Sequence, residues 1–364
     1  MRKSFTSALK AVLLSAVACG VATSAAAKQT HLLAMAACPP WKVIENDPKL
    51  TKLMAEACEK DVATIVPALR KSFAVPEENV MTRLNEQADA PGVWKAMQEL
   101  AGKAKREDRV IIYINMHGGA MDAKYRGYDV KSEILLTYTA TEPRDFSADS
   151  IADVWMTTKE LRDLINEIDA EEIILILEVC ESGASLIDFR YNLGRRYKND
   201  WNGREAIIFS SGAYQAATFN EEGTVALFTE TFARNLQEAS SGNIRDIFEN
   251  AALETHRSRR MTCMQDDNLE EFFDNRAVYL DGCTQLPSVF DPYGLLDDIQ
   301  IGGHTVKSRW AEIKDRKPAR KAASKPDDDP FAWARPYLGP LGQAQSVPAG
   351  VPPVTVYGYY PWHN

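Results

Sequence analysis

The chain has 364 residues, of which 45% are hydrophobic and 26% are charged, and its formal net charge is −9 at pH 7. Binding to the phosphates of nucleic acid needs a basic face, so this acidic balance argues against DNA or RNA as the main partner. Beyond residue 27 the sequence has no run of about 18 apolar residues and therefore predicts no transmembrane helix.

Residues 1–27 have the pattern of an export signal. A basic start precedes an apolar segment at 11–22, and small residues follow just before Lys28. The basic residues are Arg2, Lys3 and Lys10. Because cleavage removes these three and no acidic residue, the formal charge changes from −9 to −12. We expect a periplasmic or secreted protein, with lipid attachment at Cys19 as the minor alternative.

Short apolar runs alternate with segments of helical spacing from residue 31 onward. In chain order we expect a strand at 31–37, a helix at 49–73, a strand at 79–84, a helix at 92–105, a strand at 109–115, a helix at 157–168, strands at 172–179 and 205–212, and a helix at 225–239. Continuous apolar strands between helices are typical of a parallel sheet covered on both faces. Ligands of such sheets bind beyond the carboxyl ends of the strands.

The C-terminal part of the chain has a different composition. Charged residues dominate 307–329, and the text after them is rich in Pro, Gly and Tyr without a period. We expect residues 305–364 to be mostly extended or disordered. The length before this tail fits one large domain or two small ones.

Five cysteines follow residue 27: Cys38, Cys58, Cys180, Cys263 and Cys283. In an oxidising compartment an odd cysteine is either a free thiol or a partner of another molecule. Local pairing would join Cys38 to Cys58 and Cys263 to Cys283, although the sequence does not fix this connectivity. Cys180 is then the simplest choice for the odd cysteine. It could still be half of a disulfide, a buried structural thiol or a nucleophile.

Two expected strands end in chemically active side chains. His117 follows one strand in "YINMHGGA" (113–120), and Cys180 follows the next in "LEVCESGA" (177–184), each before small residues that predict a turn. A thiol attacks a carbonyl as the thiolate, and histidine can take its proton and later protonate the leaving amine. Backbone N–H groups of Gly118 and Cys180 could bind the resulting oxyanion.

These motifs resemble the clan of cysteine peptidases that contains caspases, metacaspases and legumains. "EVCESGAS" (178–185) and "HGG" (117–119) are most similar to the legumain and glycosylphosphatidylinositol-transamidase branch. Segments 56–69, 73–118 and 223–236 are similar to bacterial caspase and metacaspase domains. The resemblance implies a caspase-like three-layer αβα sandwich with a mostly parallel central sheet, which we expect at 28–304.

The resemblance also implies roles for single residues. Cys180 would be the nucleophile and His117 the general base and acid, with the main chain of Gly118 and Cys180 at the oxyanion. Glu178 would line the pocket for the side chain before the scissile bond, which favours Arg, Lys or Asn there. The other pocket wall would come from two serines after the next strand, Ser210 and Ser211.

The sequence thus predicts an exported cysteine endopeptidase that acts on a protein or peptide. A caspase-like binding or scaffold domain is one alternative, and a peptidyl transferase with the same dyad is another. Scattered histidines and the lack of a CxxC motif argue against a metal site, and we expect no cofactor; calcium dependence has no support in the sequence. The basic loop at 190–204 is a candidate for self-cleavage, and the oligomeric state is not predicted.

Overall fold

The computed structural model describes residues 28–38, 48–125, 128–138, 156–186, 189, 203–212, 215–265 and 285–303. The expected signal at 1–27, most of the basic loop at 190–204, Cys283 and the tail at 305–364 lie outside these residues. None of the described helices is both long and apolar enough to cross a membrane.

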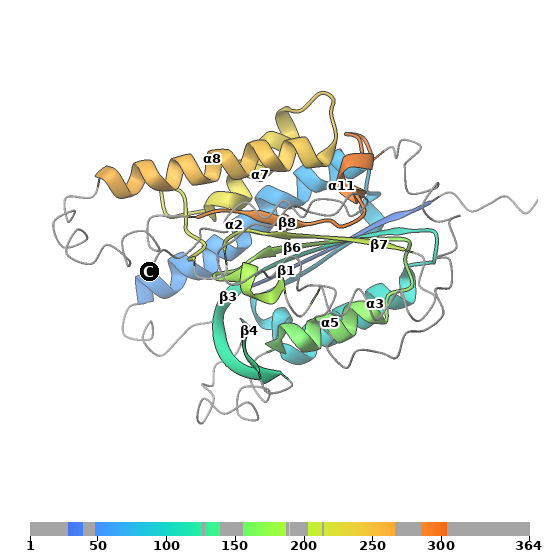
Figure 1. Cartoon of the computed structure of the whole chain (residues 1–364), viewed down its shortest axis with the longest axis horizontal. Coiled ribbons are helices and arrows are strands. Elements are labelled where there is room, and N and C mark those ends of the chain that lie inside the picture. Colours follow the sequence, from blue (N-terminus) through green and yellow to red (C-terminus); the bar gives the residue numbers. More distant parts are fainter. Residues whose placement is uncertain are drawn as a thin grey trace, which may run out of the picture.

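One mostly parallel sheet runs through the centre of the described structure (Figure 1). Its strand order is β2–β1–β3–β6–β7–β8, and only β8 on this path runs antiparallel to its neighbour. The bounds of these strands are β1 (Thr30–Ala37), β2 (Val80–Leu84), β3 (Arg109–Tyr125), β6 (Glu172–Glu178), β7 (Arg204–Phe209) and β8 (Ser288–Phe290).

Helices cover both faces of this sheet (Figure 1). One face packs against α2 (Pro48–Phe73), α7 (Leu227–Glu238), α8 (Ile244–Gln265) and the short α11 (Leu295–Asp298). The other face packs against α3 (Ala90–Lys103) and α5 (Thr158–Asn166). The predicted three-layer αβα sandwich with a mostly parallel central sheet is confirmed.

The strand sequences explain the two cores. Successive side chains of a strand point to opposite faces. In β3, Ile111 and Tyr113 accordingly face α2 and α7, whereas Ile112 and Ile114 face α3 and α5. Every residue of β6 is buried, which is why its sequence is a continuous apolar run rather than an alternating one.

Helix caps match their sequence signals. Asp89 accepts a hydrogen bond from the backbone N–H of Gly92 at the start of α3. Thr157 and Glu160 form the reciprocal capping box expected from their spacing at the start of α5. These local contacts set where the two helices on this face begin.

The predicted turn directly after His117 is wrong. β3 continues through the glycines to Tyr125 and pairs there with antiparallel β4 (Tyr128–Leu136), which in turn pairs with β5 (Met156–Thr157). Figure 1 shows β3 curving away from the central sheet over this stretch. Glycines without a β-carbon allow such a bend, and pairing with β4 satisfies the backbone groups that a turn would otherwise have used.

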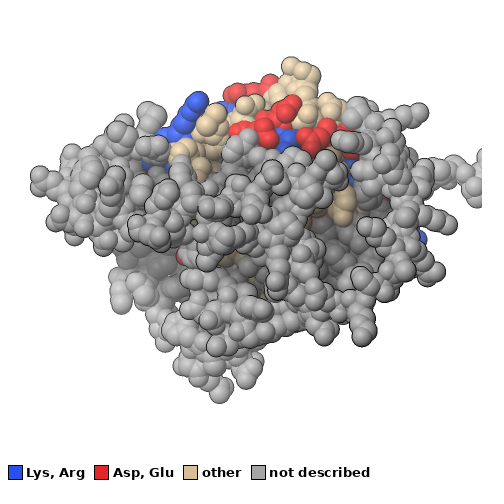
Figure 2. Space-filling view, viewed as in Figure 1, with Lys and Arg blue, Asp and Glu red and all other residues tan. Residues whose placement is uncertain are grey.

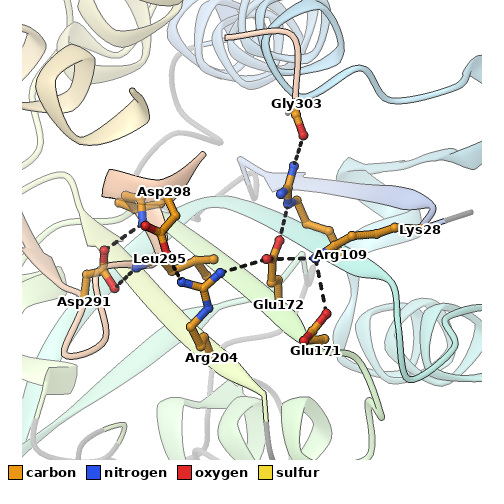
Figure 3. Close-up of polar contacts among 10 residues, drawn as sticks. Lys28, Arg109, Glu171, Glu172, Arg204, Asp291, Leu295, Asp298 and Gly303 are labelled. Carbon is orange, nitrogen blue, oxygen red and sulfur yellow. Dashed lines mark hydrogen bonds and ion pairs between the residues drawn. The ribbon is translucent and has the colours of Figure 1, made fainter. Parts of the chain in front are cut away.

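A buried ionic network joins the amino ends of three strands (Figure 3). Glu172 of β6 is 1% exposed and bonds Arg109 of β3 at 2.7 Å and Arg204 of β7 at 3.0 Å. Lys28 reaches the same carboxylate at 2.8 Å. Arg109 also donates to the carbonyl oxygen of Gly303, so the network fixes the last described residues against the sheet.

Charged side chains of both signs lie together on the described part of the face shown in Figure 2. Along α7 and α8 they form the ion pairs Arg234–Glu254 and Arg245–Glu249. Pairs of this exposed kind are worth little individually. The described residues on this face therefore gather no single-sign patch.

Cys38, directly after β1, forms a disulfide with Cys58 of α2. This is the first of the two local pairings considered from sequence, and both residues are buried. Cross-linking positions 20 residues apart restricts the unfolded chain, so replacing both cysteines with alanine should cost about 2–4 kcal/mol of unfolding free energy. Urea unfolding of the double variant measures this loss; an unchanged midpoint would show that the bond adds no stability.

Candidate active site

His117 and Cys180 lie at the carboxyl ends of neighbouring strands. β3 and β6 are parallel, and their last paired residues are Asn115 and Glu178. His117 and Cys180 each follow two residues after this pair. The predicted adjacency of the two strand ends is therefore present, and the carboxyl edge of the sheet is the place where α/β proteins bind ligands.

The half-buried Cys180 thiol is not part of a disulfide in the described structure. Its Sγ lies 3.7 Å from the carbonyl oxygen of Ala217, to which it can donate. Residues 215–218 cross the turn at this point, since the N–H of Glu181 donates to the carbonyl of Gln215 at 2.7 Å. Gln285 holds the same segment by accepting from the hydroxyl of Thr218 at 2.8 Å.

The backbone after Cys180 adopts an unusual conformation. Glu181 has φ 58° and ψ 17°, in the left-handed region that residues with a β-carbon seldom adopt. A four-residue 3₁₀ helix, Ser182–Ser185, follows. The chain thus reverses sharply behind the thiol, and the surrounding hydrogen bonds must offset a cost of about 1–2 kcal/mol.

Ser210 and Ser211 provide those hydrogen bonds. The Oγ of Ser210 accepts from the N–H of Val179 at 3.2 Å. The Oγ of Ser211 donates to the carbonyl of Val179 at 3.0 Å and accepts from the N–H of Ser182 at 3.3 Å. Both serines are fully buried. The structure therefore places them behind the Cys180 turn as its support, and their expected part in a pocket wall stays a prediction.

Replacing Ser211 with alanine should leave a buried N–H and carbonyl without this partner. We expect a loss of about 1–3 kcal/mol in unfolding free energy and a fall in peptide cleavage of roughly tenfold, because the Cys180 turn shifts. Thr231→Val is the matched control, since it removes a buried hydroxyl between α7 and α8. Equal effects of both variants on cleavage would contradict a role of Ser211 in the turn.

Glu178, the other residue expected to line the pocket, is buried as well. Its side chain is 2% exposed, and its Oε2 accepts from the N–H and the Oγ1 of Thr229 at 2.9 and 2.7 Å, in the first turn of α7. Burial, aided by the nearby carboxyl of Asp61, raises the pKa of Glu178 to about 8. Its carboxyl is thus mainly neutral at pH 7, although hydrogen bonds from Thr229 and the side chain of Ser210 act in the opposite direction.

His117 is half-buried, and this burial lowers the pKa of its imidazole below the ordinary value of 6.5. The neutral ring is therefore the main form at pH 7, as a general base requires. Gly118, the expected oxyanion residue, lies opposite Leu135 in the ladder between β3 and β4. It occupies a strand rather than the loop that the sequence predicted.

From the sequence, Asp61 of α2 was interpreted as structural or solvent-facing, yet it lies at this site. It is 1% exposed, accepts from the Nδ2 of Asn115, and accepts from the N–H of Ala226 at 2.7 Å. The carboxyl of Asp61 is close enough to raise the proton affinity of Glu178. An acidic residue inside the apolar stripe of α2 was the one available signal.

The described residues contain no group of three or more His, Cys, Asp or Glu side chains arranged to hold a metal ion. The cysteines near the site are either paired in the disulfide or, for Cys180, in contact with a carbonyl. The chemistry open to this site is therefore that of a thiol, an imidazole and two buried carboxyls.

No family model and no curated protein matches the chain. Among solved structures, protein GSU0716 from Geobacter sulfurreducens is 14% identical with a TM-score of 0.41, covering 62% of this chain and 88% of that one. Caspase-1 from Spodoptera frugiperda is 11% identical with a TM-score of 0.39, covering 73% and 89%.

A secreted C11 cysteine protease from Bacteroides thetaiotaomicron, solved with an irreversible peptide inhibitor, is 7% identical with a TM-score of 0.38. It covers 72% of this chain and 66% of that one. Every one of these TM-scores lies below 0.5. The fold is therefore assigned from the strand order and helix packing of the chain itself.

Proposed function

We propose that the chain is an exported cysteine endopeptidase with a Cys180–His117 dyad. This proposal depends on the register of β3 and β6. Asn115 and Glu178 are paired at the carboxyl edge of the sheet, and His117 and Cys180 each lie two residues beyond this pair. The thiol of Cys180, which forms no disulfide among the described residues, fits the nucleophile, and the lowered pKa of His117 fits the base.

The reaction would proceed through a thioester. His117 takes the proton of the Cys180 thiol while the sulfur bonds to the carbonyl carbon of the scissile peptide. The C–N bond then breaks, and the proton goes from His117 to the leaving amine. Water, deprotonated by His117, adds to the thioester, and the C–S bond breaks to return the thiol and release the new carboxyl end. Backbone N–H groups of Gly118 and Cys180 would bind the oxyanion in both steps.

We further propose cleavage after Arg or Lys, or after Asn. Glu178 stands two residues before Cys180, and its carboxyl is buried at the end of β6. A buried carboxyl is stabilised by a neighbouring cation or amide N–H, and a cation beside it would favour the ionised carboxylate. A substrate side chain of this kind would therefore be favoured next to Glu178.

The Cys38–Cys58 disulfide supports export, because disulfides persist in oxidising compartments and are rare in the cytosol. A transferase would use the same thioester with an amine in place of water, so the dyad alone favours neither acceptor. Endopeptidase activity is the simpler proposal, since water is always present as acceptor.

A panel of short fluorogenic peptides that differ only in the residue before the cut tests this function. It should be run with wild type and Cys180→Ala under reducing conditions, with and without calcium. We expect cleavage that depends on Cys180 and is strongest after Arg, Lys or Asn. Absence of any such cleavage would contradict the peptidase, and strongest cleavage after Asp would contradict the role given to Glu178.

A further inference from the structure

Asp61 contacts two segments that lead to the two reacting side chains. One carboxyl oxygen, Oδ2, accepts from Asn115, which lies two residues before His117 in β3. The other, Oδ1, accepts from the N–H of Ala226 at the start of α7. Asp61 itself comes from α2, one helical turn after the disulfide residue Cys58.

The contact at Ala226 continues to the thiol through a short segment. Ala226 forms an isolated β-bridge with Phe219, and the N–H of Leu227 donates to the carbonyl of Thr218 at 2.7 Å. The residue before Thr218 is Ala217, whose carbonyl lies 3.7 Å from the Sγ of Cys180. A shift of the first turn of α7 would thus move the backbone that touches the nucleophile.

We propose that Asp61 is a positioning residue that holds the His117 end of β3 and the segment against Cys180 in fixed relation to each other. The proposal rests on the proposed function and adds a residue to it. Asp61 acts on the two reacting side chains through Asn115 and Ala226. It therefore affects the rate of the chemical step more than the binding of substrate.

Both partners of Asp61 are hydrogen-bond donors, so the ionised carboxylate holds them best. Burial raises the pKa of Asp61 to about 7, so the protonated and ionised forms coexist near neutral pH. The titratable groups that interact electrostatically with it are Tyr113 on β3 and Glu178 on β6. The positioning effect should accordingly grow as the pH rises through about 7.

The test compares Asp61→Asn with wild type from pH 5.5 to 8. We expect kcat to fall about tenfold at pH 8, for Arg and Asn substrates alike, with a much smaller difference at pH 5.5 and little change in KM. The exchanged pair, Asp61→Asn with Asn115→Asp, restores a donor facing a carboxylate and should recover most of the lost kcat. A higher KM for Arg substrates alone, with kcat unchanged, would overturn the proposal.

Asp291→Asn is the matched control. Asp291 is also a buried carboxyl that accepts from two N–H groups at a helix start, those of Leu295 and Leu296 (Figure 3). It directly follows β8, which runs antiparallel to β7, and so lies toward the amino end of β7 and away from the Cys180 turn. We expect this variant to lose stability with no change in the pH profile of kcat. Equal pH-dependent losses in both variants would show a general structural effect and overturn the proposal.

Hydrogen exchange separates this proposal from the proposed function. Asp61→Asn should speed amide exchange in peptides that cover 113–117 and 215–226, whereas Asp291→Asn should not. If wild type cleaves no peptide, the proposed function fails, and exchange still tests the link that Asp61 makes. Unchanged amide exchange in both segments of Asp61→Asn would overturn the positioning role of Asp61.

Discussion

Replacing Cys180 with alanine is expected to lower kcat for peptide cleavage by about 10⁴-fold or more. The nucleophile of a thioester mechanism has no substitute, and removal of a nucleophile from a comparable catalytic unit has effects of this size. Since the side chain is only half-buried and its contact with the carbonyl of Ala217 is a weak S–H donation, the folded structure should persist. Initial rates with the best peptide of the panel measure the loss.

Two controls make this result specific. Cys180→Ala should unfold in urea near the midpoint of wild type, which shows that inactivity is not loss of fold. Cys38→Ala with Cys58→Ala should lose stability while keeping Cys180-dependent cleavage at low temperature, because that pair is structural. Cleavage by Cys180→Ala at the rate of wild type would mean that another group performs the reaction.

Replacing Glu172 with alanine is expected to cost about 3–5 kcal/mol of unfolding free energy. The carboxylate lies between the guanidinium groups of Arg109 and Arg204, whose side chains are 1% and 3% exposed. Removing it leaves two buried cations near each other without their shared anion, which costs far more than loss of a surface ion pair. Equilibrium urea unfolding near pH 7 measures the change.

Glu171 provides the matched control for this prediction. It is the neighbouring residue and also pairs with Lys28, at 3.5 Å, but its side chain is 33% exposed. Its replacement by alanine should cost only roughly 0–1 kcal/mol, because water screens the pair. Similar losses for the two variants would contradict the account of Glu172 as the centre of a buried network.

Much of the architecture could be predicted from local patterns in the sequence. Apolar runs such as 109–115 and 172–179 predicted buried strands, and the spacing of Thr157 and Glu160 predicted a helix start that the structure contains. These features depend on neighbours in the chain, so a single sequence carries them. The parallel direction of β1, β2, β3 and β6 followed because a helix was expected between each of these strands and the next.

Contacts between distant residues could not be predicted in this way. Ser211 supports the Cys180 turn across 29 and 32 residues, and Asp61 binds Ala226 across 165 residues. A pair of glycines after His117 is as compatible with a turn as with a strand that bends, and only pairing with β4 decides between them. Burial of Glu178 likewise depends on where α7 packs.

Covalent trapping of the thiol tests the central proposal most directly. Wild type, His117→Ala and Cys180→Ser are each treated with a peptidyl chloromethyl ketone that ends in arginine, and the adducts are mapped by peptide mass spectrometry. We expect one adduct, on Cys180 of wild type, with formation slowed about 100-fold or more in His117→Ala because the base that activates the thiol is gone. An adduct that forms equally fast without His117, or on a residue other than Cys180, would contradict the dyad.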